Sequence, residues 1–205
     1  KTHVDMTDNF SMEEWGKVID VAKKHDLMLF EDRKFADIGR VTETQMAGMY
    51  DIRSWADLVT SHSVSGPDIV DGIASAWDSV QRVGGVLLLA QMSSRGNLLD
   101  ASYTDRTMEI GTSSPHVIGY IGNGSNPNEV SELRKKAGDG KMIWTPGVNL
   151  SDNEGALGQR YGHPSDAIKA GSDAVIVGSG IHGAPDPVAS ARAYADATWA
   201  ALLSR

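Results

Sequence analysis

The chain contains 205 residues, of which 40% are hydrophobic and 22% are charged. These fractions are typical of a globular protein and argue against a disordered chain. Cysteine is absent, which excludes disulfides, cysteine-bound zinc and thiol nucleophiles and fits a reducing compartment such as the cytoplasm. The formal net charge of −8 argues against nucleic acid as a partner, and no apolar run reaches the ~18–20 residues needed to cross a membrane.

Short apolar runs rich in β-branched residues recur along the chain. They cover Leu27–Asp32, Ala56–His62, Val86–Gln91, Val117–Gly122, Met142–Val148 and Ala174–Gly178. Their starts lie about 30 residues apart and amphipathic stretches fill the gaps, which is the spacing of successive βα units. Because most of the runs are continuously hydrophobic, we expect parallel strands that are covered on both faces.

Helix signals fall between these runs. The sequence Ser11-Met12-Glu13-Glu14 has the capping-box pattern, which predicts a helix start. Proline at a first helical position predicts three more starts, at Pro67, Pro127 and Pro187. Between Pro67 and Arg82 the apolar residues recur at helical spacing, which predicts one buried face.

The strand-helix units favour an α/β fold, a (β/α)8 TIM barrel forming a single domain over residues 1–205. A doubly wound open sheet is the competing architecture. The barrel is favoured because polar residues follow nearly every predicted strand, and barrel enzymes assemble their active sites at such strand ends. A barrel of this kind usually takes ~250 residues. The opening segment Lys1–Asp5 resembles the end of a strand, so we expect the first strand and most of the second to be missing from this chain.

The densest polar cluster follows the first of these runs. Alternation along a strand predicts that Asp32 and Lys34 share one face, with Asp37 in the loop that follows. One interpretation is a surface salt bridge without function. The other is a lysine held between carboxylates and ready to deliver a proton.

Sequence motifs in this region resemble those of the orotidine 5′-monophosphate decarboxylase family, especially its fungal and animal type. The segment Leu29–Gly39, LFEDRKFADIG, is similar to the family signature, and Lys1–Asp5, KTHVD, is similar to the active-site strand that precedes it. Three weaker matches follow in the same order as in the family: Leu89–Ser93, Thr145–Val148 and Ala156–Tyr161.

The resemblance implies decarboxylation of orotidine 5′-monophosphate to uridine 5′-monophosphate in pyrimidine biosynthesis, without a metal or an organic cofactor. Lys34 corresponds to the lysine that protonates C6 of the pyrimidine as carbon dioxide leaves. Asp32, Lys1 and Asp37 correspond to its partners in an alternating charged array. In the family the equivalent of Asp37 comes from the other subunit of a homodimer, so shared active sites are implied.

The resemblance also implies a set of substrate-binding residues. Thr2 and His3 lie beside Lys1 in the same substrate-contacting strand end, and Ser93 and Pro146 contact the pyrimidine ring. Gln159 and Tyr161 grip the phosphate. A glycine-rich loop after the last strand, with Gly178, Ser179 and Gly180, binds the phosphate as well.

The chain departs from the family pattern at the glycine-rich loop and directly after Asp-Ile-Gly, in addition to the first strand, which carries a ribose-binding aspartate in the family and is absent from this sequence. Ser179 stands where the family normally has an arginine that clamps the phosphate. Arg40-Val41 replaces the usual Asn-Thr after Asp-Ile-Gly, which removes a hydroxyl that contacts the ribose. The loop Gly178–Gly183 also matches the dinucleotide fingerprint G-x-G-x-x-G, but a single helix and no further βαβ unit is predicted after it.

Two alternative functions remain open from the residues. The first is a magnesium-dependent sugar-phosphate decarboxylase or aldolase of the same barrel superfamily, which shares an Asp-x-Lys-x-x-Asp motif. Lys1 argues against it, because an ammonium group at the preceding strand end would repel the cation. The second is a non-catalytic relative that binds a nucleotide, which Ser179 and Val41 favour and the intact charged residues oppose.

Overall fold

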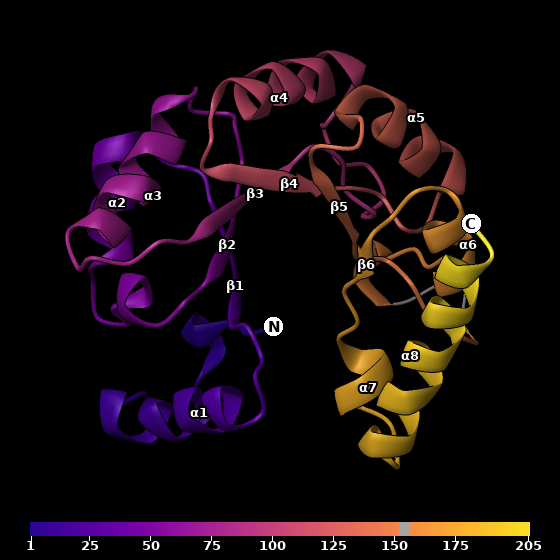
Figure 1. Ribbon diagram of the computed structural model, residues 1–205, viewed down its shortest axis with the longest axis horizontal. Coiled ribbons are helices and arrows are strands. Elements are labelled where there is room, and N and C mark those ends of the chain that lie inside the picture. The colour runs from indigo at the N-terminus through magenta and orange to yellow at the C-terminus, as the bar shows by residue number, and fades with distance from the viewer. Residues whose placement is uncertain (152–155) are drawn as a thin grey trace. The chain divides into compact units, whose positions relative to one another are not determined.

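Strands and helices alternate along the chain (Figure 1). The computed structural model describes residues 1–151 and 156–205. The chain divides into two compact units. Unit 1 comprises Lys1–Leu89 and Glu109–Ile118, and unit 2 comprises Ala90–Met108 and Gly119–Arg205. Helix α4 (Ala101–Ser113) and strand β4 (Val117–Ile121) each contain residues of both units.

Unit 1 contains three strands in which β1 pairs with β2 and β2 pairs with β3, both in parallel. Its elements are the 3-10 helix Val4–Met6, α1 (Met12–Lys24), β1 (Phe30–Phe35), α2 (Gly39–Met46), the 3-10 helix Ile52–Ser54, β2 (Leu58–Ser61), α3 (Asp68–Asp78) and β3 (Gly85–Leu89). Every residue of β2 and β3 is buried, as predicted for strands covered on both faces.

In unit 2, β5 pairs in parallel with β4 and with β6. Beyond α4 and β4 its elements are α5 (Pro127–Ala137), β5 (Met142–Thr145), the 3-10 helix Ala156–Gly158, α6 (Pro164–Lys169), β6 (Ala174–Val175), α7 (Ser179–His182) and α8 (Pro187–Leu203). A single helix follows Gly183, as predicted, so the glycine-rich match leads into α8 and not into a further βαβ unit.

Each of the predicted strands is present, but the first begins later than predicted. Leu27 and Met28, which were included in that strand, are exposed, and β1 runs from Phe30 to Phe35. The strand therefore carries the polar cluster along its length instead of ending where the cluster begins.

The predicted helix starts are confirmed at four places. The Ser11 hydroxyl accepts a hydrogen bond from the Glu14 N–H at 3.2 Å and caps α1. Pro127 and Pro187 are the first residues of α5 and α8, and Pro67 lies one residue before α3. The predicted face of α3 is buried, with Ile69, Val70, Ile73, Ala74 and Trp77 in the core.

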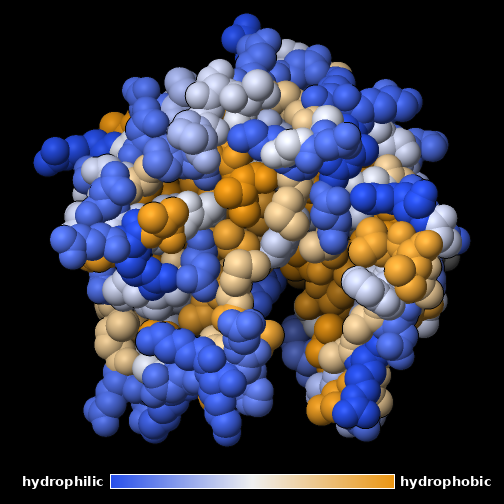
Figure 2. Space-filling view, viewed as in Figure 1, coloured by the Kyte–Doolittle hydropathy of each residue, from blue (hydrophilic) through white to orange (hydrophobic). Residues whose placement is uncertain are grey.

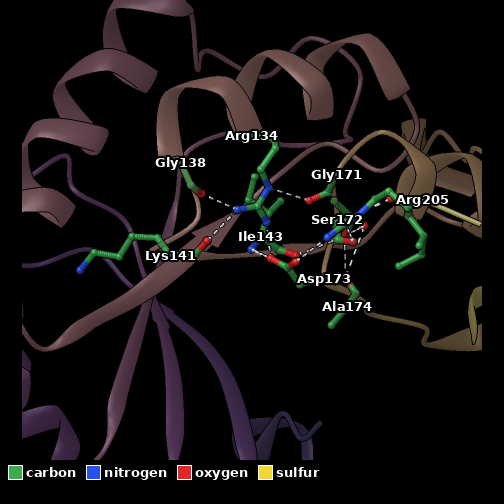
Figure 3. A network of polar contacts seen from close by, with 11 residues as sticks. Arg134, Gly138, Lys141, Ile143, Gly171, Ser172, Asp173, Ala174 and Arg205 are labelled. Carbon is green, nitrogen blue, oxygen red and sulfur yellow. Dashed lines mark hydrogen bonds and ion pairs between the residues drawn. The ribbon is translucent and has the colours of Figure 1, made fainter. Parts of the chain in front are cut away.

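A polar network in unit 2 joins α5 to the strand pair β5–β6 and to the end of the chain (Figure 3). The Arg134 guanidinium donates to the carbonyls of Gly138, Lys141 and Gly171 and forms an ion pair with Asp173. The Oδ2 atom of Asp173 also accepts a hydrogen bond from the Ile143 N–H at 2.8 Å, and the Arg205 Nη2 lies 3.5 Å from Asp173 Oδ1. One carboxylate thus organises the segment that precedes β6.

Helix α8 exposes several large apolar side chains, with Val188, Trp199 and Leu203 each more than half exposed. Figure 2 shows hydrophobic surface among hydrophilic residues in the region where Figure 1 draws α8. Within the described residues, no helix combines the length and the apolar character that a membrane span requires.

Two glycines set the approach of α2 to α3 in unit 1. A Cβ at Gly72 would lie 2.2 Å from the carbonyl oxygen of Gly39, and a Cβ at Gly39 would lie 2.3 Å from that of Asp68. Because both obstacles are backbone atoms, neither position accepts a side chain without moving a helix. This contact fixes the start of α2, two residues after Asp37.

We predict that Gly72→Ala lowers the free energy of unfolding by about 1–3 kcal/mol, the usual cost of forcing a methyl group into a packed contact. Gly16→Ala in α1 is the matched control, because nothing lies within 4 Å of a Cβ there. It should stabilise the protein by about 0.5–1 kcal/mol, since alanine is the better helix former. Urea denaturation measures both values, and equal stability of the two variants would contradict this packing account.

Candidate active site

A buried carboxylate lies between two ammonium groups in unit 1. The Lys34 Nζ is 2.7 Å from Asp32 Oδ1, and the Lys1 Nζ is 3.2 Å from Asp32 Oδ2. His3 Nε2 lies 3.5 Å from Asp32 Oδ2 and 2.9 Å from the Lys1 Nζ. Asp32 is 8% exposed, so these groups, and not water, supply most of its solvation.

The contact between Asp32 and Lys34 was predicted, but the strand geometry that produces it was not. Glu31 pairs with Val59 and Phe35 pairs with Ser61, so three residues of β1 face one residue of β2, Thr60. Lys34 adopts a left-handed backbone conformation with φ 52° inside this bulge. Bulges of this kind re-aim side chains near active sites. Regular alternation is therefore not what brings Lys34 to Asp32.

The segment Lys1–Val4 is joined to β1 by backbone hydrogen bonds and by one buried side chain. Thr2 forms a parallel bridge with Glu31, donating to the Phe30 carbonyl at 2.8 Å and accepting from the Asp32 N–H at 3.0 Å. The Glu31 carboxylate accepts from the Thr2 hydroxyl at 2.6 Å and from the Val4 N–H at 3.1 Å. These bonds agree with the predicted strand-end character of the segment and hold Lys1 and His3 beside Asp32.

The charges of the cluster are reflected in its pKa values. Burial by itself raises the pKa of Asp32, but the Lys34 ammonium lowers it through its charge and its hydrogen bond. Lys1 and the Thr60 hydroxyl lower it further, and the net pKa lies below the ordinary value. Asp32 is therefore ionised at neutral pH. Burial raises the pKa of Glu31, against the hydrogen bonds from Thr2 and Val4.

Asp37 lies outside this contact set. It is exposed, and its carboxylate accepts a hydrogen bond from the Ile38 N–H at 2.8 Å. Its carbonyl accepts from the hydroxyls of Thr42 at 3.1 Å and Ser65 at 2.9 Å, which fix the loop. Within the part of the chain that the structure describes, Asp37 forms no ion pair with Lys34.

Unit 2 brings two predicted substrate-binding residues together. The Gln159 Nε2 donates to the Ser93 Oγ at 2.9 Å and to the Arg160 carbonyl at 2.7 Å, and the Arg160 Nε donates to the Ser93 carbonyl at 3.0 Å. A Cβ on Gly147 would lie 2.5 Å from that of Ser93, so Ser93 packs against the residue that follows Pro146. Pro146 itself is half-buried.

The remaining predicted residues of unit 2 lie in two loops. Tyr161 is half-buried and follows the hydrogen-bonded pair Gln159 and Arg160. Gly178 caps α7, Ser179 is exposed, and a Cβ on Gly180 would lie 2.4 Å from the Tyr194 hydroxyl. A side chain at position 180 would therefore displace this loop or the Tyr194 ring of α8.

His3, Asp5 and Glu31 could together offer three metal-ligand atoms within 4.8 Å of one another. Both oxygens of Glu31 already accept hydrogen bonds, and the Lys1 ammonium faces His3 Nε2 at 2.9 Å. These contacts compete with a cation, so the group is poorly suited to hold a metal.

Comparison with known proteins agrees with the predicted family. The model of the orotidine 5′-phosphate decarboxylase / HUMPS family matches residues 1–194. The chain belongs to this family. It is 40% identical to the orotidine 5′-phosphate decarboxylase of Pichia kudriavzevii and 41% identical to that of Maudiozyma exigua, covering all of this chain and 78% and 76% of those proteins.

A solved structure shares the fold. The orotidine 5′-phosphate decarboxylase from Pyrococcus horikoshii OT3 aligns with a TM-score of 0.68 and 27% sequence identity, over 90% of this chain and 82% of that one. The predicted α/β class and decarboxylase family are thus confirmed. The sequence analysis of this orotidine 5′-phosphate decarboxylase family member did not identify Glu31 and Thr60. Glu31 accepts a hydrogen bond from Thr2, and Thr60 donates one to Asp32. Glu31 lies beside Asp32 in β1, and Thr60 lies in the neighbouring strand β2; these positions were the only signals in the sequence.

Two half-buried histidines should make the stability of this family member depend on pH. Burial, and then the charge of Lys34, lowers the pKa of His62; burial and the charge of Lys1 lower that of His3. Below the ordinary histidine pKa of about 6.5 the unfolded chain binds protons that the folded chain resists, so stability falls as the pH falls.

We predict that His62→Gln reduces the loss of unfolding free energy between about pH 7 and pH 5, because one of these contributions is removed. Denaturant titrations at a series of pH values measure the slope. His25→Gln is the matched control, since it removes a histidine from an exposed position at the end of α1. A slope unchanged in His62→Gln would show that burial does not resist protonation of His62.

Proposed function

We propose that this chain decarboxylates orotidine 5′-monophosphate to uridine 5′-monophosphate without a metal or an organic cofactor. The observation that carries the proposal is the buried Asp32 carboxylate held between the ammonium groups of Lys34 and Lys1. Family membership supplies the substrate, and this charge arrangement supplies chemistry that suits it.

The reaction breaks the bond between C6 of the pyrimidine and its carboxylate. Carbon dioxide leaves, and the electron pair of the broken bond stays on C6. The Lys34 ammonium stabilises this developing charge and then gives its proton to C6, which completes uridine 5′-monophosphate. Solvent returns a proton to Lys34. Asp32 keeps the ammonium in place, and its negative charge disfavours the bound substrate carboxylate more than the transition state.

We also propose the substrate contacts, which the resemblance to the family supports. Thr2 and His3 contact the substrate beside Lys1, Ser93 and Pro146 contact the ring, and Gln159 and Tyr161 bind the phosphate. The loop Gly178–Gly180 offers backbone N–H groups to the same phosphate. Binding energy from this remote group is available to promote the reaction at C6.

The proposal extends to architecture and assembly. Both units belong to one (β/α)8 barrel domain over residues 1–205. The protein acts in the cytoplasm as a homodimer in which Asp37 completes the partner's charged array. Asp37 is exposed and precedes Ile38, and its carbonyl accepts a hydrogen bond from Ser65, the residue after Val64. Ile38 and Val64 are 58% and 67% exposed, and such exposed apolar side chains suit an interface with a second copy.

We predict that Lys34→Ala lowers turnover of orotidine 5′-monophosphate about 10³-fold or more, because both charge stabilisation and the proton donor are lost. Release of carbon dioxide measures turnover. Lys17→Ala is the matched control, because Lys17 pairs with Glu14 on the exposed surface of α1. Near-normal turnover by a folded Lys34→Ala variant would remove the assignment.

A chelator separates this function from the magnesium-dependent alternative. Turnover should be the same with and without EDTA, because ammonium groups occupy both oxygens of Asp32. Loss of turnover in EDTA, restored by Mg²⁺, would favour the sugar-phosphate enzymes. Wild-type protein that binds uridine 5′-monophosphate but releases no carbon dioxide would favour the non-catalytic relative.

Shared sites predict complementation. Mixing Lys34→Ala with Asp37→Ala should restore about one quarter of the wild-type activity, since random exchange makes half of the dimers mixed and each mixed dimer has one intact site. Mixing Lys34→Ala with Asp32→Ala is the control and should restore none, because those two residues act from the same chain. Failure of the first mixture despite demonstrated subunit exchange would contradict shared sites.

The serine at position 179 predicts weak phosphate recognition. A serine hydroxyl is a neutral donor, whereas an arginine makes charge-assisted and often bidentate hydrogen bonds. Ser179→Arg should therefore tighten binding of uridine 5′-monophosphate by about tenfold or more and leave binding of uridine almost unchanged. Calorimetric titration with both ligands measures this. Equal affinity for the nucleotide before and after the change would show that another residue already serves as the clamp.

A further inference from the structure

The bulge in β1 leaves Thr60 opposite the catalytic pair. Asp32, Arg33 and Lys34 share Thr60 as their only counterpart on β2, because regular pairing ends at Glu31 and resumes at Phe35. A bulge disrupts the ladder locally and leaves backbone groups that need other partners. The Lys34 N–H is one such group, in a residue with a left-handed backbone.

The Thr60 hydroxyl serves both members of the pair. It accepts a hydrogen bond from the Lys34 N–H at 2.9 Å and donates one to Asp32 Oδ1 at 2.8 Å. The same carboxylate oxygen lies 2.7 Å from the Lys34 Nζ. Thr60 is fully buried, and on its other side β2 pairs with β3 at Leu87. Its position is therefore set by the core of unit 1.

We propose that Thr60 is a positioning residue for the decarboxylation, because its hydroxyl fixes the backbone of Lys34 and the carboxylate of Asp32 in one geometry. Without the hydroxyl, Lys34 loses the partner of its backbone N–H, and Asp32 can rotate about its side-chain bonds. Lys1 and His3 approach the other oxygen, Oδ2, so they do not replace this bond. Small displacements of a reacting group have large effects on rate.

The role rests on the proposed decarboxylase function, and its test uses three variants of the full chain. Thr60→Val keeps the shape and removes the hydroxyl, and Thr60→Ser keeps the hydroxyl. Thr104→Val is the matched control, because Thr104 is also buried and its hydroxyl donates a hydrogen bond to the Ala90 carbonyl within unit 2. Thermal unfolding checks that each variant folds.

Thr60→Val should lower kcat for orotidine 5′-monophosphate by roughly 10- to 100-fold and change KM by less than about threefold. Thr60→Ser should restore most of kcat, and Thr104→Val should leave it unchanged. A carboxyl titration by NMR should show a higher pKa for Asp32 in Thr60→Val and recovery in Thr60→Ser, which a purely structural defect would not produce. A folded Thr60→Val variant with wild-type kcat and wild-type Asp32 titration would overturn the proposal.

If Thr60→Val does not fold, the wild-type protein and Thr60→Ser decide the question. The Lys34 amide should exchange slowly with solvent in both, and rapid exchange would overturn the role of the Thr60 hydroxyl. If the wild-type protein shows no turnover, the proposed function fails. The Asp32 titration and the Lys34 exchange still test whether Thr60 fixes the pair.

Discussion

Burial of the Asp32 carboxylate is the constraint on which the site of unit 1 depends. A carboxylate that is 8% exposed loses most of its hydration, and only close positive groups and hydrogen bonds offset that loss. Lys34 and Lys1 supply the charges and Thr60 supplies a hydroxyl. The arrangement that keeps Asp32 ionised also fixes the Lys34 ammonium group beside it, and in the proposed reaction this group stabilises and protonates the carbanion.

Backbone features of unit 1 deliver these groups. A bulge in β1 turns Lys34 toward Asp32, and a parallel bridge at Thr2 sets Lys1 beside the same carboxylate. The close approach of Gly39 and Gly72 fixes where α2 begins and so where the Asp37 loop lies. None of these features is itself a charged group, yet each determines where one of the charged side chains of the proposed site lies.

Part of this could be predicted from the sequence and part could not. Apolar runs located every strand, because continuous burial leaves a clear pattern, and the motif around Asp32 and Lys34 pointed to the family. The register shift between β1 and β2 was not predictable from the sequence. It depends on how two segments about 30 residues apart pair with each other, and the bulge has no sequence signature. Thr60 was missed for the same reason. The contact between Ser93 and Gln159 depends on loop geometry that periodicity does not describe.

The most direct test of this account is the rate of decarboxylation by Asp32→Asn. Asparagine keeps the size and shape of the side chain but removes the charge that holds both ammonium groups. We predict that kcat/KM for orotidine 5′-monophosphate falls by about 10²-fold or more while the variant stays folded. A folded Asp32→Asn variant with near-wild-type kcat/KM would contradict the account, because the buried charge would then have no role in the reaction.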